Sequence, residues 1–184
     1  MSANFKRVPE TQLGYEPNQV DATIALARQQ FSEPTSRVIG ASGLRTSQFE
    51  LVKGGYEVAS VDAALDRLDD AFAQNEANRL IALSGHHGAR DYVANLGHTL
   101  VERASRPSAK KFRRTGWFAK GYSRRQVDAI VSLVRESVQS QDELAVSYLR
   151  QVVFSPRWGG YRENQVDAFI DRAIEFFQLS RSVL

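Results

Sequence analysis

Gly14-Tyr15, four further residues and then Val20-Asp21-Ala22 form the first of four copies of one pattern in this 184-residue chain. The other copies begin at Gly55, Gly121 and Gly160 and keep the same five residue types at the same spacing. A pattern that recurs at fixed spacing indicates a repeated structural unit. Four positions of each copy define the motif: Gly14, Tyr15, Val20 and Asp21; Gly55, Tyr56, Val61 and Asp62; Gly121, Tyr122, Val127 and Asp128; Gly160, Tyr161, Val166 and Asp167.

Each copy is typical of a turn that leads into a helix. Glycine permits a turn that a residue with a Cβ resists, and Pro17 suits a first helical position. Ser123 and Gln126 have the spacing of a capping box, whereas Arg162 is a poor residue beside the positive end of a helix dipole. The same dipole favours the Asp of each copy. We expect the Tyr to cover the first turn of its own helix, as in a hydrophobic staple. These motif residues are therefore interpreted as structural rather than ligand-binding.

The Val of each copy opens an apolar stripe at steps of three and four, the spacing of one helix face. Burying four such side chains stabilises a repeat by roughly 6–12 kcal/mol. The loss of conformational entropy costs ~1.5 kcal/mol for each of the ~15 residues that become ordered, which is more in total. No repeat can therefore fold alone, and each helix must pair with another. The stripes are Val20, Ile24, Ala27 and Phe31; Val61, Leu65, Leu68 and Phe72; Val127, Val131, Val134 and Val138; Val166, Ile170, Ile174 and Phe177.

The copies fall into two kinds, which indicates a duplicated pair. A Phe precedes the Gly by nine residues in the first and third copies, at Phe5 and Phe112. The second and fourth copies instead share Leu-Arg, then Phe, then Gly-Gly-Tyr, starting at Leu44 and at Leu149. We expect the first copy to pack against the second and the third against the fourth.

The repeated Gly-Tyr and Val-Asp-Ala, with the preceding Phe and the following hydrophobic helix, resemble the amino-terminal domain of DivIVA, a bacterial scaffold of division sites and cell poles. The tandem copies resemble the DivIVA-repeat proteins. The resemblance implies a turn and a helix that pairs into a parallel coiled coil, and membrane attachment and scaffolding without catalysis. In that family an aromatic and a basic residue just before the Gly-Tyr contact lipid. The matching residues are Trp158, with Arg157 beside it, in the fourth copy, and Lys120, with Trp117 and Phe118 beside it, in the third. Before its Gly-Tyr, the second copy has a basic residue, Lys53, but no aromatic one. The first copy has neither an aromatic nor a basic residue there.

Charge is concentrated in the segment 103–127, which holds nine basic residues and no acidic one. A basic residue gains about 1 kcal/mol near an anionic lipid surface, and aromatic side chains add burial at the headgroup boundary. The same mixture could bind nucleic-acid phosphates and bases, or form a solvated linker whose aromatics fold back. The candidate membrane or partner contacts are Lys110, Lys111, Arg113, Arg114, Trp117, Phe118, Lys120, Arg157 and Trp158.

Composition favours a cytoplasmic protein that is soluble or peripheral at the inner face of the cell membrane. Hydrophobic residues make up 42% of the chain and charged residues 24%, which is ordinary for a globular protein. The chain has no Cys, so it has no disulfide framework. We expect no signal peptide, because the first residues lack an apolar core, and no run approaches the ~20 apolar residues of a membrane span.

No constellation of residues predicts catalysis, a cofactor or a metal ion. His87 and Asp91, and likewise His98 and Glu102, are four apart, but one such pair supplies only two ligands. The two pairs are about 16 Å apart along a straight helix. The Gly-Gly-Tyr segments lack the spacing of a phosphate-binding loop. We therefore expect that the protein is not an enzyme.

The predicted fold is all-α, with four turn-plus-helix repeats arranged as a duplicated pair and helices packed pairwise or as a coiled coil. No segment alternates as a strand would. The expected division is 1–84 for the first repeat pair, 85–111 for a connecting helix and basic linker, and 112–184 for the second pair. We expect helices over about 17–32, 59–84, 89–104, 124–139, 141–153 and 163–179, and a helical turn around 42–47.

The predicted function is that of a non-catalytic scaffold or adaptor that associates through helices with itself or with a DivIVA-like coiled coil. Attachment to an anionic membrane surface, in cell division or polar growth, is part of this expectation. The alternatives are a purely soluble protein-interaction module, in which the aromatics are buried, and a nucleic-acid-binding protein that uses the basic segment. No small-molecule substrate is expected.

Overall fold

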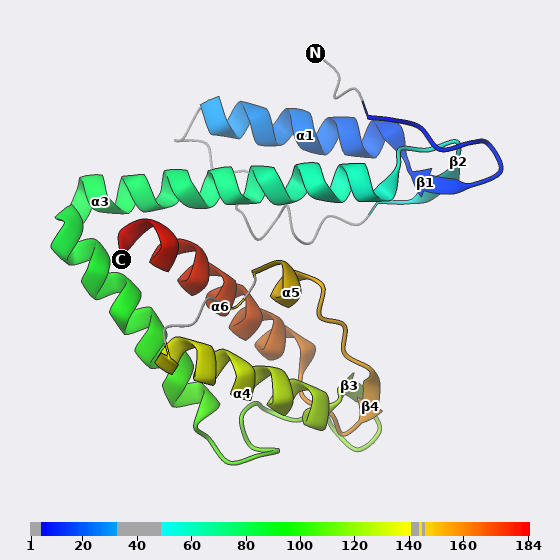
Figure 1. Cartoon of the computed structure of the whole chain (residues 1–184). Helices are drawn as coiled ribbons and strands as arrows, with labels where there is room; N and C mark the ends of the chain where they lie inside the picture. Colours follow the sequence, from blue (N-terminus) through cyan, green and yellow to red (C-terminus); the bar gives the residue numbers. More distant parts are fainter. Residues whose placement is uncertain (1–4, 33–48, 141–143, 145) are drawn as a thin grey trace. The chain divides into compact units, whose positions relative to one another are not determined.

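The computed structural model describes residues 5–32, 49–140, 144 and 146–184. It divides into two compact units, residues 1–76 and 77–184. Five helices and four three-residue strands occur in the described residues (Figure 1). In order they are β1 (Leu13–Tyr15), α1 (Pro17–Ser32), β2 (Leu51–Lys53), α3 (Val58–Ala104), β3 (Lys120–Tyr122), α4 (Arg124–Ser140), α5 (Val146–Arg150), β4 (Pro156–Trp158) and α6 (Glu163–Val183).

The first unit contains a small antiparallel sheet and two helices. β1 pairs with β2, with Leu13 opposite Lys53 and Tyr15 opposite Leu51. α1 and the first part of α3 both start at this sheet and run away from it in the same direction (Figure 1). Their facing sides form one cluster around Val20 and Val61, both fully buried. The seam continues to the far end of α1, where the Phe31 and Phe72 ring centroids are 5.8 Å apart.

The second unit repeats this arrangement and adds further helices. β3 pairs antiparallel with β4, with Lys120 opposite Trp158, and α4 and α6 both begin at that sheet (Figure 1). The main cluster joins the buried faces of α4 and α6 to α5 and to the end of α3. A second cluster packs Val93 of α3 against Leu179 and Val183 of α6. The first Val of each stripe is thus fully buried, as predicted, whereas Phe31 at the end of the first stripe is exposed.

The two motif glycines of each unit lie where two backbones cross. A Cβ on Gly121 would lie 2.2 Å from the carbonyl oxygen of Tyr161, and one on Gly160 would lie 2.5 Å from that of Gly121. Gly14 and Gly55 have the same close contacts in the first unit. Any side chain here would collide with main chain, which cannot swing aside as a flexible side chain can. The motif position therefore needs glycine, because the two backbones lie too close together to leave room for a Cβ.

Each motif tyrosine reaches across to the other motif copy of its unit. The Tyr56 hydroxyl donates to the Asp21 carboxylate at 3.3 Å, and the Tyr161 hydroxyl donates to Asp128 at 2.9 Å. In the opposite direction, burial and the nearby Asp62 carboxylate raise the pKa of Tyr15. Burial and the Asp167 carboxylate raise the pKa of Tyr122 in the same way.

The prediction of a mostly helical chain is confirmed, but two finer expectations, the absence of strands and a capping box, are wrong. Four short strands occur where none was expected, and Gly14-Tyr15 and Gly121-Tyr122 lie in β1 and β3. The hydroxyls of Tyr56 and Tyr161 also contact the Asp of the other copy, a contact that the sequence did not predict. Gln126 forms no capping box with Ser123, because its side-chain oxygen accepts from the Ser155 N–H at 2.9 Å. Arg162, as expected, makes no side-chain cap.

The boundaries between helices differ from the predicted ones in the middle of the chain. α3 continues to Ala104, and Gly85, with φ 71° and ψ 171°, interrupts its helical geometry where a stop was predicted. The first unit ends at residue 76 rather than 84, and the predicted connecting segment 85–111 belongs to the second unit. Among the described residues of the predicted helix 141–153, α5 spans Val146–Arg150. The helical turn expected around 42–47 lies outside the described residues.

We expect the protein to be a monomer in dilute solution. The Val-led faces that need a partner are closed within the chain, since Val20, Val61, Val127 and Val166 are all 0% exposed. Light scattering coupled to gel filtration should give a molar mass near the chain mass of 20.6 kDa at every concentration loaded. A mass twice as large that persists on dilution would contradict this prediction.

Candidate functional site

In the second unit, a tight turn comes directly before β3. The Ala119 N–H donates to the Gly116 carbonyl at 3.0 Å, which is the hydrogen bond of a β-turn. The Thr115 hydroxyl donates to the Ala119 carbonyl at 2.9 Å, and the Gly159 N–H donates to the same carbonyl at 3.1 Å. The turn is therefore tied to itself and to the residue after β4. Its two central residues are Trp117 and Phe118.

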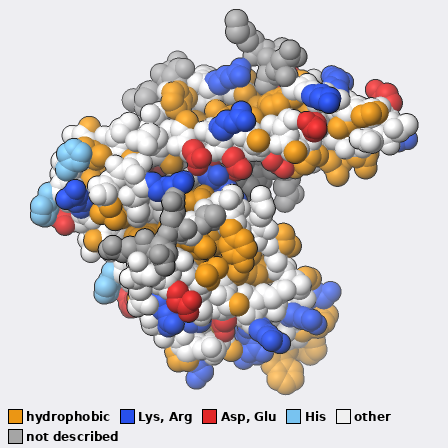
Figure 2. Space-filling view, in the orientation of Figure 1, with side chains coloured by type: hydrophobic (Ala, Val, Ile, Leu, Met, Phe, Trp, Pro, Cys, Tyr) orange, Lys and Arg blue, Asp and Glu red, His pale blue; other side chains and the backbone are white. Residues whose placement is uncertain are grey.

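Large aromatic side chains project from this turn and from the neighbouring strand. Trp117 is 86% exposed, Phe118 is 95% exposed and Trp158 of β4 is 63% exposed. The Lys120 ammonium lies 5.4 Å from the centroid of the Trp158 ring, a cation–π contact. In Figure 2 hydrophobic side chains beside Lys and Arg side chains gather where Figure 1 draws β3 and β4. We call this surface, formed by Trp117, Phe118, Lys120, Arg157 and Trp158, the aromatic tip.

Basic side chains next to the aromatic tip are also exposed. Arg113 and Lys110 are exposed on the segment that leads to the turn. Arg114 is exposed too, and its Nε donates to the Gly159 carbonyl at 3.3 Å. The segment 103–127 holds no acidic residue. The aromatic tip therefore combines apolar surface with excess positive charge.

Lys111 and Phe112 do not belong to this surface, although the sequence places them in the same basic run. Lys111 is only 5% exposed, and its ammonium donates to the carbonyls of Ala104 and Arg106 at the carboxyl end of α3. Burial lowers the pKa of Lys111. The Phe112 ring packs edge-on against Tyr161. The predicted linker is thus partly core, and Lys111 acts as a helix cap.

The first unit carries the same turn with different residues at its centre. The Gln12 N–H donates to the Pro9 carbonyl at 2.8 Å, and the Gly54 N–H donates to the Gln12 carbonyl at 3.2 Å. The central residues are Glu10 and Thr11 in place of Trp117 and Phe118. Equivalent hydrogen bonds therefore hold a polar, acidic turn in one unit and an aromatic turn in the other.

The histidine pairs form no larger cluster. The His87 Nδ1 lies 2.9 Å from the Asp91 carboxylate, and both side chains are mostly exposed. Among the described residues no group of three His, Asp or Glu side chains could hold a metal ion. None of the helices in these described residues is long and apolar enough to cross a bilayer.

One repeated residue of the motif is missing from the sequence interpretation. Three copies carry a Gln immediately before the Val, at Gln19, Gln126 and Gln165. Each side-chain oxygen accepts a backbone N–H from a segment next to the sheet, from Glu50, Ser155 and Arg113 respectively. The recurrence of Gln at one motif position is the signal that could have revealed this contact.

Comparison with known proteins gives no match: no protein-family model, no curated protein and no solved structure matches the chain.

Proposed function

We propose that this protein is a non-catalytic adaptor that attaches to an anionic membrane surface through the aromatic tip of its second unit. The observation that carries the proposal is the pair Trp117 and Phe118, which a hydrogen-bonded turn holds almost fully exposed. Contiguous apolar surface that a protein leaves exposed often marks a place where another molecule binds. Excess basic charge around the pair favours a lipid surface that carries negative charge.

The repeats support a scaffold of the DivIVA type that is closed within one chain. In both units two helices start at one sheet and run from it with their Val-led faces together. The glycine crossing and the Tyr–Asp contact recur at matching motif positions. A duplicated pair of repeats accounts for all of these contacts. Each unit is then an intrachain counterpart of the parallel helix pair that the resemblance implies, which leaves the outer surfaces for partners.

The proposal also accounts for the difference between the two turns. Burial of a large apolar side chain contributes roughly 1.5–3 kcal/mol, and interfacial Trp and Phe side chains lie at the headgroup boundary. The first unit, with Glu10 at the corresponding place, would repel an anionic surface. Membrane attachment is therefore assigned to the second unit alone.

Exchanging the centre of one turn for that of the other tests the proposal. The double variant Trp117→Glu/Phe118→Thr reproduces a turn that the chain already uses, so its fold should be retained. Co-sedimentation with vesicles of mixed phosphatidylglycerol and phosphatidylcholine should show binding of the wild-type protein that weakens as salt rises. The double variant should bind at least about tenfold more weakly, because each tenfold step needs only 1.4 kcal/mol.

The matched control is Leu83→Ser, which removes an apolar side chain that is 76% exposed away from the aromatic tip. This variant should bind vesicles as the wild-type protein does. Two results would refute membrane attachment: no sedimentation of the wild-type protein, or equal sedimentation with purely phosphatidylcholine vesicles at all salt concentrations. Equal loss in both variants would show that the aromatic tip is not the binding surface.

A further inference from the structure

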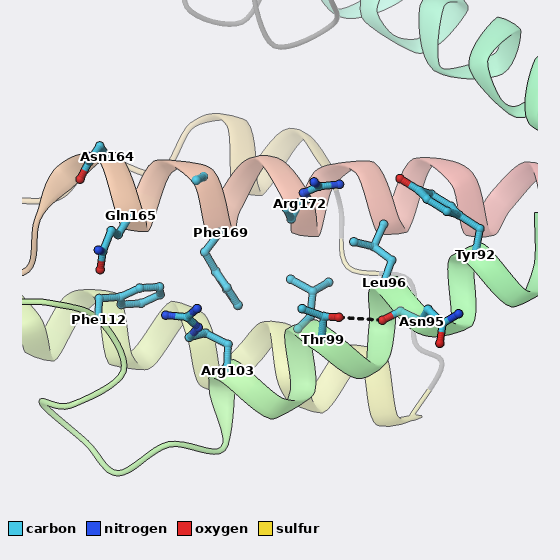
Figure 3. A pocket seen from close by; sticks show the side chains of 12 residues that line it. Tyr92, Asn95, Leu96, Thr99, Arg103, Phe112, Asn164, Gln165, Phe169 and Arg172 are labelled. Carbon is cyan, nitrogen blue, oxygen red and sulfur yellow. Dashed lines mark hydrogen bonds between the residues drawn. The ribbon is translucent and has the colours of Figure 1, made fainter.

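A groove lies within the second unit, between α3 and the start of α6 (Figure 3). Its volume is about 550 Å³, which is within the usual size of a small-molecule site. Residues 92–103 of α3 form one wall, residues 164–172 of α6 form the other, and Phe112 closes one end. None of these residues belongs to the aromatic tip.

The floor of the groove is apolar. Leu96, Leu100, Phe112 and Phe169 line it, and all four are buried in the core of the unit. Along α3 the distance from Leu96 to Arg103 corresponds to about 10 Å at 1.5 Å per residue. These four side chains expose at most 9% of their surface, so a bound hydrocarbon chain would contact their edges and the exposed ring of Tyr92.

The two ends of the groove differ in how their charges are paired. At one end the Tyr92 hydroxyl donates to Glu175 at 2.8 Å, and Arg172 donates to the other oxygen of the same carboxylate at 3.0 Å. Arg172 is therefore neutralised. Figure 3 places Tyr92 and Leu96 at this end, with Arg103, Phe112 and Gln165 at the opposite one.

At the opposite end the charge of Arg103 has no acidic partner in the lining. The Arg103 guanidinium lies 5.9 Å from the centroid of the Phe112 ring, and no Asp or Glu lines the groove. Gln165 lies at this end as well. Its oxygen accepts from the Arg113 N–H, so its NH₂ group is left to donate. Together these groups supply donors for an anion beside an apolar floor.

We propose that this groove binds a single-chain amphiphile with a carboxylate head. The carboxylate accepts hydrogen bonds from the Arg103 guanidinium, for which a planar two-oxygen anion is the matching geometry. The hydrocarbon chain runs from Arg103 along α3 toward the exposed ring of Tyr92. This site goes beyond the proposed membrane contact, because it takes up a separate molecule on another surface of the unit.

Decanoate, used below its micelle concentration, is the probe. Titration followed by ¹H–¹⁵N NMR should shift the resonances of Leu96, Leu100 and Phe169, and calorimetry should yield one site per chain. Acetate, which lacks the chain, and decyltrimethylammonium, which has a cationic head, should not bind there. Arg103→Gln should weaken decanoate binding about tenfold or more, since a hydrogen bond to a charged group is lost.

Two further variants keep the outcome decisive. Ala168→Phe adds bulk at an exposed position in the groove wall and should also abolish binding. Arg90→Gln, an exposed arginine of α3 that does not line the groove, should bind as the wild-type protein does. The Trp117→Glu/Phe118→Thr variant should keep full decanoate affinity, which separates this site from the aromatic tip.

Four results would overturn the proposal: no shifts in the groove, equal binding of the cationic amphiphile, unchanged affinity in Arg103→Gln, or loss of decanoate binding in the aromatic-tip variant. The last result would place the bound chain on the aromatic tip instead of in the groove.

Discussion

Gly121→Val is expected to unfold the second unit or to lower its free energy of unfolding by about 3 kcal/mol or more. The added Cβ would lie 2.2 Å from the Tyr161 carbonyl oxygen and 2.8 Å from the Thr115 Cγ2 atom. The strands would have to separate, which breaks the hydrogen bonds that Tyr122 and Tyr161 exchange at 2.9 Å. Thermal unfolding followed by circular dichroism should show a midpoint lower by roughly 6–12 °C, at about 2–4 °C for each kcal/mol.

Gly116→Val is the matched control, because no atom lies within 4 Å of the position that its Cβ would take. Both variants add the same side chain to the same segment, so any change in intrinsic backbone preference is similar. Gly116→Val should shift the midpoint by no more than a few degrees. If both variants unfolded at the wild-type temperature, this result would contradict the close contact between the backbones of the two motif copies at Gly121.

The helices were predictable because their signals are local. Val20, Val127 and Val166 each begin a stripe at helical spacing, and all three are fully buried. Pro17 and Gly85 mark a helix start and a helix break by their own backbone preferences, and both do so in the structure. Periodicity and backbone preference are properties of a single segment, and no knowledge of its neighbours is needed to interpret them.

The sheets were not predictable because their partners are distant and their strands are short. Leu13 pairs with Lys53, and Lys120 pairs with Trp158, each across a long intervening helix. A strand of three residues is too short to show alternation. The role of the motif Asp was missed for the same reason. A carboxylate early in a helix has a sufficient local explanation in the helix dipole, so the contact from Tyr161 to Asp128 had no separate signal.

The candidate site was only partly visible in the sequence. Charge and aromatic content selected Trp117, Phe118 and Trp158, which are exposed together. The same criteria also selected Lys111, whose side chain turns inward to the end of α3. Composition cannot separate these cases, because the direction of each side chain follows from the packing of its segment. Arg103 was counted only as part of the basic segment 103–127, because its groove forms where α3 and α6 lie together.

The two turns have the same backbone hydrogen bonds but different residues at their centres. Hydrogen bonds from Gly54 and from Gly159 hold the two turns in the same way, and both glycines have a positive φ, of 65° and 61°. This backbone geometry accommodates both an acidic and an aromatic pair of central residues. Those residues are free to vary, so Glu10 and Trp117 can present opposite chemistry from equivalent positions.

Tyr161→Phe is expected to lower the free energy of unfolding by about 1–3 kcal/mol at neutral pH. The Tyr161 hydroxyl accepts from the Lys111 N–H at 3.2 Å and donates to Asp128 at 2.9 Å. The ring itself is fully buried, so phenylalanine keeps the packing and removes only these two hydrogen bonds. Urea unfolding of both proteins gives the difference. Tyr56→Phe should lower the free energy of unfolding by less, because the Tyr56 hydroxyl lies 3.3 Å from the Asp21 carboxylate and its hydrogen bond is longer.

The same variant should show a characteristic dependence on alkaline pH. Burial, followed by the hydrogen bond to Asp128, raises the pKa of Tyr161 from 10.0 to about 12. The unfolded chain thus loses the phenolic proton first, and the contribution of Tyr161 to stability is complete below pH 10 and declines as the pH rises toward 12. The gap in unfolding free energy between wild type and Tyr161→Phe should therefore be widest below pH 10 and should narrow above it. A gap that stays constant from about pH 8 to about pH 11.5 would mean that the Tyr161 hydroxyl is not held in its neutral form between the two motif copies.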